Sequence, residues 1–342
     1  MPLRPMRLPG DFASVIDMMA ETFHYPENPE WGIQADEQQD LARDAKVLKR
    51  VWPIFRVLQA VSPSLRGVLG GFVWEESGKM AGVAFYERQG MTKSWHISTV
   101  GVRPEYRRRG IARELVTGLL EELRKREGVQ ATLGVIDRNV PAYSLYTSLG
   151  FEQYNHSVEF ELAASAAPET PALPHGYIQE DVRRSDEWRV QYELDKRISP
   201  PQLTQYQPVT PGRYRVPALL RAFLPIRRMM QRREEKAILV RRTTDRSPVT
   251  WGLYNVPKGP GGVCLVQIRL DPEHPQLADY LVAHHLEQVA SRAPGRRVTF
   301  QVEDWMPDLI RAAERYGFTR RVEHHYLGLM LQPQPAGRSN RT

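Results

Sequence analysis

One segment, residues 98–113 (STVGVRPEYRRRGIAR), constrains the fold most because it reads as a strand, a basic turn and a helix in succession. Pro104 ends the strand, and Gly110 can adopt the left-handed backbone angles of a tight turn. The first free N–H groups of the helix point outward with its positive dipole end. Because Gly110 and Ala112 leave the backbone accessible and arginines supply charge-assisted hydrogen bonds, the segment predicts a cradle for a pyrophosphate. It lacks both the Gly-x-Gly-x-x-Gly dinucleotide pattern and the Gly-Lys-Ser/Thr ending of a nucleotide P-loop.

Hydrophobic periodicity predicts a mixed α/β fold for the first half of the chain. The expected elements are helices over 12–23 and 36–61 (the second broken at Pro53), a hairpin of strands 71–76 and 79–88, a strand over 94–102, a helix over 111–126, a strand over 131–136, a helix over 140–149 and two closing strands. This order predicts three layers around a mixed sheet.

A chain of 342 residues is long enough for two domains. Residues 162–176 are rich in Pro, Ala and Ser without periodicity, as an inter-domain linker is. We predict a first domain over 1–163, a linker over 164–175, a second domain over 176–332 and a disordered tail over 333–342.

A faint internal repeat relates the two halves. Its members lie a near-constant distance apart in the sequence, which predicts a duplication. The matched positions are Pro53 with Pro225, Pro104 with Pro272, and Gly150-Phe151 with Gly317-Phe318.

Two motifs at the expected distance resemble the GNAT superfamily of N-acetyltransferases. The first is Arg107-x-x-Gly110-x-Ala112 after a strand, which resembles motif A; the second is Asn139-x-x-Ala142-x-x-Leu145-Tyr146-x-x-x-Gly150-Phe151. The resemblance covers about residues 71–162. It implies two tandem GNAT-like domains, each a mixed, largely antiparallel twisted sheet flanked by helices, with acetyl-CoA as co-substrate of the first and no metal.

The resemblance also implies roles for residues of the first half. Backbone N–H groups of Val100 and Val102 face the pantetheine arm and the thioester oxygen, Asn139 contacts the pantetheine region and Tyr146 protonates the leaving thiolate. Tyr146 could instead be a half-buried aromatic of an amphipathic helix, and Asn139 is also a suitable helix N-cap. The expected cofactor-binding residues are Val100, Val102, Arg107, Arg108, Arg109, Gly110, Ile111, Ala112, Arg113, Asn139 and Tyr146.

Two residues are candidates for the general base. His96 lies on the motif A strand where many relatives carry Glu, and the ordinary pKa of histidine suits a base. Glu87 on the neighbouring strand is the second candidate, and His96 could equally be a structural histidine of the sheet. No spacing rule decides between them.

The second half has lost the chemistry of the cradle. Its strand over 263–270 leads to Asp271, Pro272 and Glu273, and Pro275 and Ala278 stand where the first half has Arg107 and Gly110. The counterparts of the other site positions are Tyr280 for Ala112, Met306 for Asn139 and Ala313 for Tyr146. We therefore predict a degenerate domain that packs against the first and shapes the acceptor pocket.

The net charge of +7 fits an anionic partner but does not choose among nucleic acid, membrane and small molecule. A second arginine group, Arg227, Arg228, Arg232 and Arg233, is interpreted as a solvated helix face, with RNA binding as the alternative. The one cysteine, Cys264, is expected to be buried and inert. The pairs His284-His285 and His324-His325 invite a metal interpretation that we reject, because neighbours on a strand face opposite ways.

The sequence thus predicts a cytoplasmic N-acetyltransferase, monomeric or homodimeric, that transfers acetyl to a primary amine by direct attack in a ternary complex. No secretory signal or membrane segment is expected. The alternatives are an acyl-CoA-binding sensor or scaffold without turnover, and an RNA-directed acetyltransferase. The acceptor is not identified by any motif; the resemblance implies that its pocket is built from residues 21–69 and 154–160.

Overall fold

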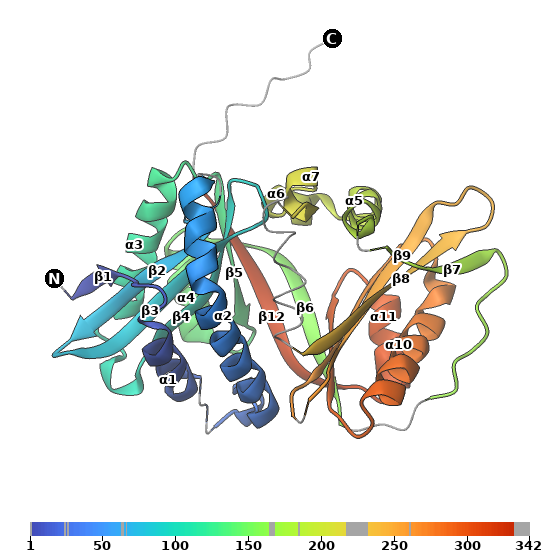
Figure 1. Ribbon diagram of the computed structural model, residues 1–342, viewed down its shortest axis with the longest axis horizontal. Coiled ribbons are helices and arrows are strands. Elements are labelled where there is room, and N and C mark those ends of the chain that lie inside the picture. The colour runs from blue at the N-terminus through green and yellow to red at the C-terminus, as the bar shows by residue number, and fades with distance from the viewer. Residues whose placement is uncertain are drawn as a thin grey trace, which may run out of the picture.

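The computed structural model describes residues 2–331 except residues 24, 26, 63, 64, 66, 164–167, 184, 217–231 and 260. Its strands form one continuous 12-stranded sheet with the order β1-β2-β3-β4-β5-β12-β6-β11-β10-β9-β8-β7 (Figure 1). The predicted mixed α/β class with helices flanking a mixed sheet is confirmed.

The two halves repeat one order of elements. The first comprises β1 (Leu3–Pro5), α1 (Phe12–Thr22), η1 (Pro29–Trp31), α2 (Ala35–Val61), β2 (Leu69–Glu76), β3 (Lys79–Arg88), β4 (Ser94–Val102), η3 (Pro104–Tyr106), α3 (Ile111–Lys125), β5 (Gln130–Ile136), α4 (Val140–Ser148) and β6 (Glu152–Leu162). The second comprises β7 (Tyr177–Asp181), α5 (Glu187–Ile198), α6 (Pro201–Tyr206), α7 (Pro211–Tyr214), β8 (Arg233–Arg242), β9 (Pro248–Pro257), β10 (Cys264–Leu270), η4 (Pro275–Leu277), α10 (Ala278–Arg292), β11 (Val298–Glu303), α11 (Pro307–Arg315) and β12 (Thr319–Met330).

The expected break of the second helix at Pro53 is wrong. Helix α2 runs through Pro53, whose ring is exposed. Proline removes only one backbone hydrogen bond, and the neighbouring Trp52 ring packs against Phe12 at 5.9 Å and Phe55 at 5.5 Å. These contacts hold the helix on both sides of the proline.

The expectation of two closing strands within the first half is also wrong. Only β6 follows α4, and the strand beside β5 is β12 from the far end of the chain. β12 pairs antiparallel with both β5 and β6, and β6 in turn pairs with β11 of the second half. The halves therefore exchange their last strands, as domain-swapped subunits do. The predicted domain limits stay predictions, because each half completes its sheet with a strand of the other.

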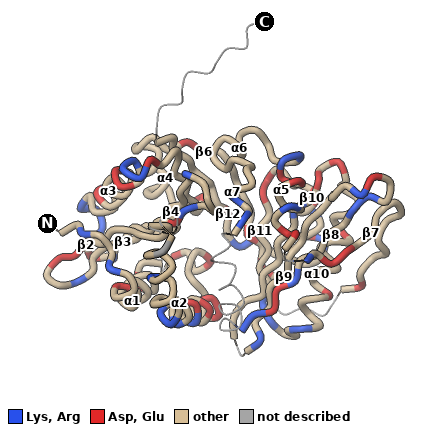
Figure 2. Tube along the Cα trace, turned by 45° about the horizontal axis from the view of Figure 1, so that its top comes forward, with Lys and Arg blue, Asp and Glu red and all other residues tan. Residues whose placement is uncertain are grey.

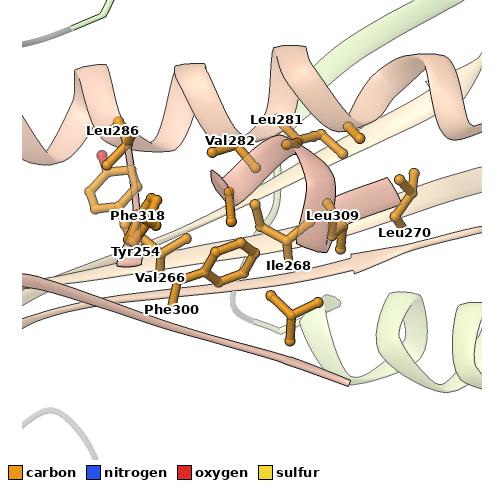
Figure 3. Packing of buried hydrophobic residues seen from close by; sticks show 14 of the residues in the cluster. Tyr254, Val266, Ile268, Leu270, Leu281, Val282, Leu286, Phe300, Leu309 and Phe318 are labelled. Carbon is orange, nitrogen blue, oxygen red and sulfur yellow. The ribbon is translucent and has the colours of Figure 1, made fainter. Parts of the chain in front are cut away.

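Helices cover both faces of the sheet. Ala84 faces the core beneath α3 and α4, whereas its neighbour Val83 faces α1. In the second half Ile238 faces α10 and α11, and its neighbour Leu239 faces α5. Figure 3 shows the larger core, where Tyr254, Val266, Ile268 and Phe300 of the strands meet Leu281, Val282 and Leu286 of α10.

Cys264 lies in this core, fully buried as predicted. Burial raises the pKa of its thiol to about 11, which keeps it protonated and unreactive at neutral pH.

An ion network joins the first turn of α2 to the second half. Arg297 donates to Asp36 at 2.7 Å and to Glu37 at 2.9 Å, and Arg321 of β12 donates to Glu37 at 3.1 Å and to Glu159 at 2.9 Å. These side chains are largely buried, so the network contributes to the docking of the two halves.

Lys and Arg are spread over both halves in the view of Figure 2 rather than gathered on one surface. Among the described helices, none is long and apolar enough to cross a membrane.

Candidate active site

The turn between β4 and α3 has the backbone that the sequence predicts for it. Arg108 and Gly110 both have positive φ, 65° and 80°, and α3 begins directly after Gly110. No atom lies within 4 Å of the position that a Cβ on Gly110 would take, so space is open in front of the helix end. The unbonded N–H groups of the first turn, from Ile111 to Arg113, face that end. The turn is therefore open to an anion.

The strand before this turn separates from its neighbour. β4 pairs in parallel with β5 only from Ser94 to Ile97, although β4 continues to Val102. The Arg103 N–H donates to the Ala81 carbonyl on β3 at 2.9 Å. Because N–H groups alternate in direction along a strand, those of Val102 and Val100 point away from β3. They face the gap between β4 and β5.

The arginine side chains of the turn have different hydrogen-bond and ion-pair partners. Arg107 donates to the carbonyls of Val102 at 3.2 Å and Thr22 at 3.0 Å, so its side chain fastens the turn to the end of α1. Arg113 donates to Ser148 Oγ at 2.8 Å and ties α3 to α4. Arg109 lies over the Tyr106 ring and 3.5 Å from Glu76, on the surface, and Arg108 is exposed. Arg108 and Arg109 are thus better placed than Arg107 and Arg113 to meet an anion at the turn.

Helix α4 holds the two residues of the second motif. Asn139 is its N-cap, with Oδ1 accepting from Ala142 N–H at 3.3 Å. Tyr146 is buried, and its ring meets Phe151 edge to face at 6.0 Å. Burial, with a smaller contribution from the charge of Tyr25, raises the pKa of Tyr146 well above its ordinary value. A tyrosine phenol is protonated at neutral pH without this shift, which by itself makes Tyr146 a weaker acid.

Tyr25 is a residue that sequence reasoning missed. It lies between α1 and α2, stacks edge to face on Trp31 at 5.5 Å, and interacts electrostatically with both Arg107 and Tyr146. Burial raises its pKa. No periodic or motif signal marks the irregular segment that carries it, so only the fold places it beside the site.

His96 and Glu87 stand opposite each other on β4 and β3 and share one face of the sheet. His96 Nδ1 lies 3.2 Å from Thr132 Oγ1 on β5. Burial lowers the pKa of His96, and the charge of Arg213 lowers it further; burial raises the pKa of Glu87. Both shifts move the groups towards the neutral form: His96 is then more fully in its basic form but is a weaker base, whereas Glu87 is less fully ionised but its carboxylate is a stronger base. The shifts therefore do not decide between the two candidates.

The corresponding turn of the second half is occupied by side chains. Asp271 accepts from Glu273 N–H at 3.0 Å and pairs with Arg197 at 2.7 Å. Ala278, in the place of Gly110, is buried and helical, and Tyr280 donates to Gln179 Oε1 at 2.5 Å. β10 and β11 still separate after Val266, but the turn beside the gap is acidic and filled.

Comparison with known proteins agrees with this geometry. The sequence profile of the acetyltransferase (GNAT) family matches residues 35–151. The [ribosomal protein bS18]-alanine N-acetyltransferase of Escherichia coli (strain K12) is 37% identical over 82 residues, 24% of this chain and 54% of the relative. The chain thus spans about half the length of the curated relatives it matches.

Solved structures resemble the whole chain. The tandem GNAT protein from the clavulanic acid biosynthesis pathway has a TM-score of 0.64 at 16% identity, covering 97% of this chain and 99% of that one. The GCN5-related N-acetyltransferase from Sphaerobacter thermophilus has a TM-score of 0.62 at 15% identity, with 97% and 96% covered. The match to the acetyltransferase (GNAT) family thus lies within the first half of the chain, and the likeness to the two solved structures extends a shared fold over both halves.

The remaining predicted groups lie elsewhere. His284 and His285 lie on helix α10, so the expectation that this pair lies on a strand is wrong. His285 is buried, its Nδ1 lies 2.7 Å from the Leu281 carbonyl, and burial lowers its pKa to about 4. Within the described ranges, no cluster of three or more His, Cys, Asp or Glu side chains is arranged to hold a metal ion.

Of the second arginine group, Arg227 and Arg228 lie outside the described residues. Arg233 pairs with Asp40 at 2.9 Å and donates to the Val263 carbonyl at 2.7 Å, which is a structural role.

Proposed function

We propose that the chain is an acetyl-CoA-dependent N-acetyltransferase whose acceptor is a primary amine. The observation that carries the proposal is the open gap between β4 and β5 beside the unobstructed turn at Gly110, a combination that the second half has lost. The bacterial relative named above is named for transfer to an alanine nitrogen of a ribosomal protein, which supports a nitrogen acceptor.

The residues of the first half fit acetyl-CoA along its length. N–H groups of Ile111 to Arg113, with Arg108 and Arg109, would hold the pyrophosphate. Val100 and Val102 N–H groups would donate to the pantetheine arm and the thioester oxygen, and Asn139 would contact the same arm. When bound, acetyl-CoA supplies an activated acyl group.

The chain's own groups then move protons at each end of the reaction. An alkyl amine with a pKa of about 10.4 must lose a proton before it attacks, and His96 or Glu87 takes it. Tyr146, whose phenol is protonated at neutral pH, donates to the departing thiolate sulfur. Direct attack within the ternary complex needs no covalent enzyme intermediate.

Replacing Gly110 with aspartate tests the cofactor site. We expect at least about a tenfold loss of acetyl-CoA affinity, because the change puts negative charge and a strained positive φ where the anion binds. Calorimetric titration measures it, with wild type expected to bind one equivalent per chain. Gly295 also has a positive φ, 75°, and open space around it, so Gly295→Asp is the matched control and should bind normally. Equal loss in both variants would contradict the site.

The pH dependence of kcat/KM decides between His96 and Glu87. A base works when deprotonated, so activity is present above its pKa and lost as pH falls through it. Because burial lowers the pKa of His96, we expect kcat/KM to be flat near pH 7 and to decline only below the ordinary histidine pKa of about 6.5. His96→Gln should remove this acid limb. If the limb persists in His96→Gln and disappears in Glu87→Gln, the base is Glu87.

A further inference from the structure

Arg213 belongs to the second half of the chain but reaches the first. Its segment, α7, is fixed by close backbone packing: Met91 N–H donates to the Gly212 carbonyl at 2.7 Å. Gly90 has a φ of 59°, and a Cβ there would lie 2.6 Å from the carbonyl oxygens of both Gly212 and Arg213. The backbone therefore delivers Arg213 to the end of the β3–β4 hairpin, close to His96.

The partners of Arg213 are neutral. Nη1 donates to Gln89 Oε1 at 3.2 Å, and Nη2 donates to Gln207 Oε1 at 2.6 Å. Across the described part of the chain, no carboxylate pairs with it within 4.0 Å. Other largely buried arginines, Arg233, Arg297 and Arg321, each pair with at least one carboxylate. A partly buried guanidinium that is bound only by neutral amide oxygens can still form an ion pair with an anion.

Arg213 also lines a cavity of about 500 Å³, whose lining residues all belong to the second half of the chain. Tyr326 of β12 forms another part of the wall, so the cavity reaches the strand that lies beside β5, on the side of β5 opposite the gap. Arg269 lies in the same wall but is already paired with Glu303. Gln89, which accepts from Arg213, donates from Nε2 to Thr132 Oγ1 at 3.2 Å, and His96 Nδ1 lies 3.2 Å from the same oxygen. A ligand held by Arg213 is thus near the candidate base.

The charges of the cavity narrow the class of anion. Glu187, Asp195 and Glu303 also line it; Glu303 is paired with Arg269, and Asp195 accepts from Tyr214 Oη at 2.8 Å. Three carboxylates disfavour a doubly charged phosphate more than a single carboxylate held by Arg213, and they suit a nearby ammonium group. A planar guanidinium matches a carboxylate with two parallel hydrogen bonds.

We propose that Arg213 anchors a carboxylate of the acceptor, so that the substrate class is an amine that also carries a carboxylate, such as an amino acid or a short peptide with a free C-terminus. This inference rests on the proposed function and assigns a specificity-determining role to the degenerate half. The second half supplies the anchor, and the first half supplies the cofactor site.

Matched acceptor pairs test the proposal through turnover. Amino acids and dipeptides are compared with their C-terminal amides, with acetyl-CoA saturating, in wild type, Arg213→Gln, Arg213→Lys and Arg215→Gln. Arg215 follows in the same segment, is exposed and lies over the Trp188 ring, so it is the matched control. We expect wild type to favour the free acid in kcat/KM by about tenfold to a hundredfold. The preference should vanish in Arg213→Gln, persist in part in Arg213→Lys and persist fully in Arg215→Gln.

A binding experiment keeps the inference testable without turnover. N-acetyl amino acids and their amides, as product-like probes, are titrated calorimetrically into wild type and Arg213→Gln. Binding of acids over amides by wild type alone supports the anchor. If wild type binds none of the acids, or if Arg213→Gln keeps the preference, the inference is overturned. Acetyl-CoA titration is read separately: failure of wild type to bind it would defeat the proposed function, whereas normal binding without acid selectivity would defeat only this inference.

Discussion

Replacing Tyr146 with phenylalanine is expected to lower kcat by about a hundredfold to ten-thousandfold while acetyl-CoA affinity changes by less than about twofold. The phenol is protonated at neutral pH, which is the form that can donate to a leaving thiolate, and phenylalanine has no proton to give. Phenylalanine keeps the edge-to-face contact with Phe151, so the variant should fold normally. Steady-state kinetics and calorimetry on the same preparation separate the loss of chemistry from a loss of binding.

Tyr143→Phe is the matched control for this experiment. Tyr143 lies one turn earlier on α4 and its hydroxyl donates to Gln153 Oε1 at 3.3 Å in an exposed position. Its removal should change kcat by less than about twofold. Full activity in Tyr146→Phe would make Tyr146 a packing residue and leave the acid unassigned. A wild-type protein that binds acetyl-CoA yet acetylates no amine would favour the alternative of a binding protein without turnover.

Replacing Arg321 with alanine is expected to lower the free energy of unfolding by about 3–5 kcal/mol. Its side chain is 6% exposed and donates to Glu37 at 3.1 Å, to Glu159 at 2.9 Å and to the Gly32 carbonyl at 2.8 Å. The change leaves buried carboxylates without this partner at the junction of α2 with the exchanged strand β12. The loss therefore falls on the contact between the halves, and denaturant unfolding measures it.

The neighbouring residue provides the control. Arg320 has a side chain that is 49% exposed and pairs with Glu314 and Glu323 on the surface. Arg320→Ala should cost less than about 1 kcal/mol, because exposed ion pairs are screened by water and salt. Similar losses in the two variants would show that burial of the Arg321 network does not set its contribution.

Local rules in the sequence were sufficient for the cofactor turn and its flanking elements. The strand over 94–102 was predicted with the bounds that β4 has, and helix α3 begins at the predicted residue. Gly110 was predicted to need left-handed angles, and its φ is 80°. Each of these features depends on residues within one or two turns of one another, where propensity, proline and glycine decide the backbone.

The residues around the turn were less predictable. Sequence spacing gave Arg107, Arg109 and Arg113 the same role, but their side chains contact different partners. Tyr25 and Arg213 carried no signal, since one lies in an irregular segment and the other is on a short helix in the opposite half. A side chain's partners depend on which elements lie beside it.

The sequence by itself determined most elements of the first half, the class of fold, the open turn at Gly110 and the loss of that turn in the second half. Only the tertiary structure decided that β12 lies between β5 and β6, that α2 continues through Pro53 and that Arg213 stands near His96. The physical reason is that strands with the same alternation of apolar residues can pair with more than one neighbour. Their choice is made by the packing of the whole sheet.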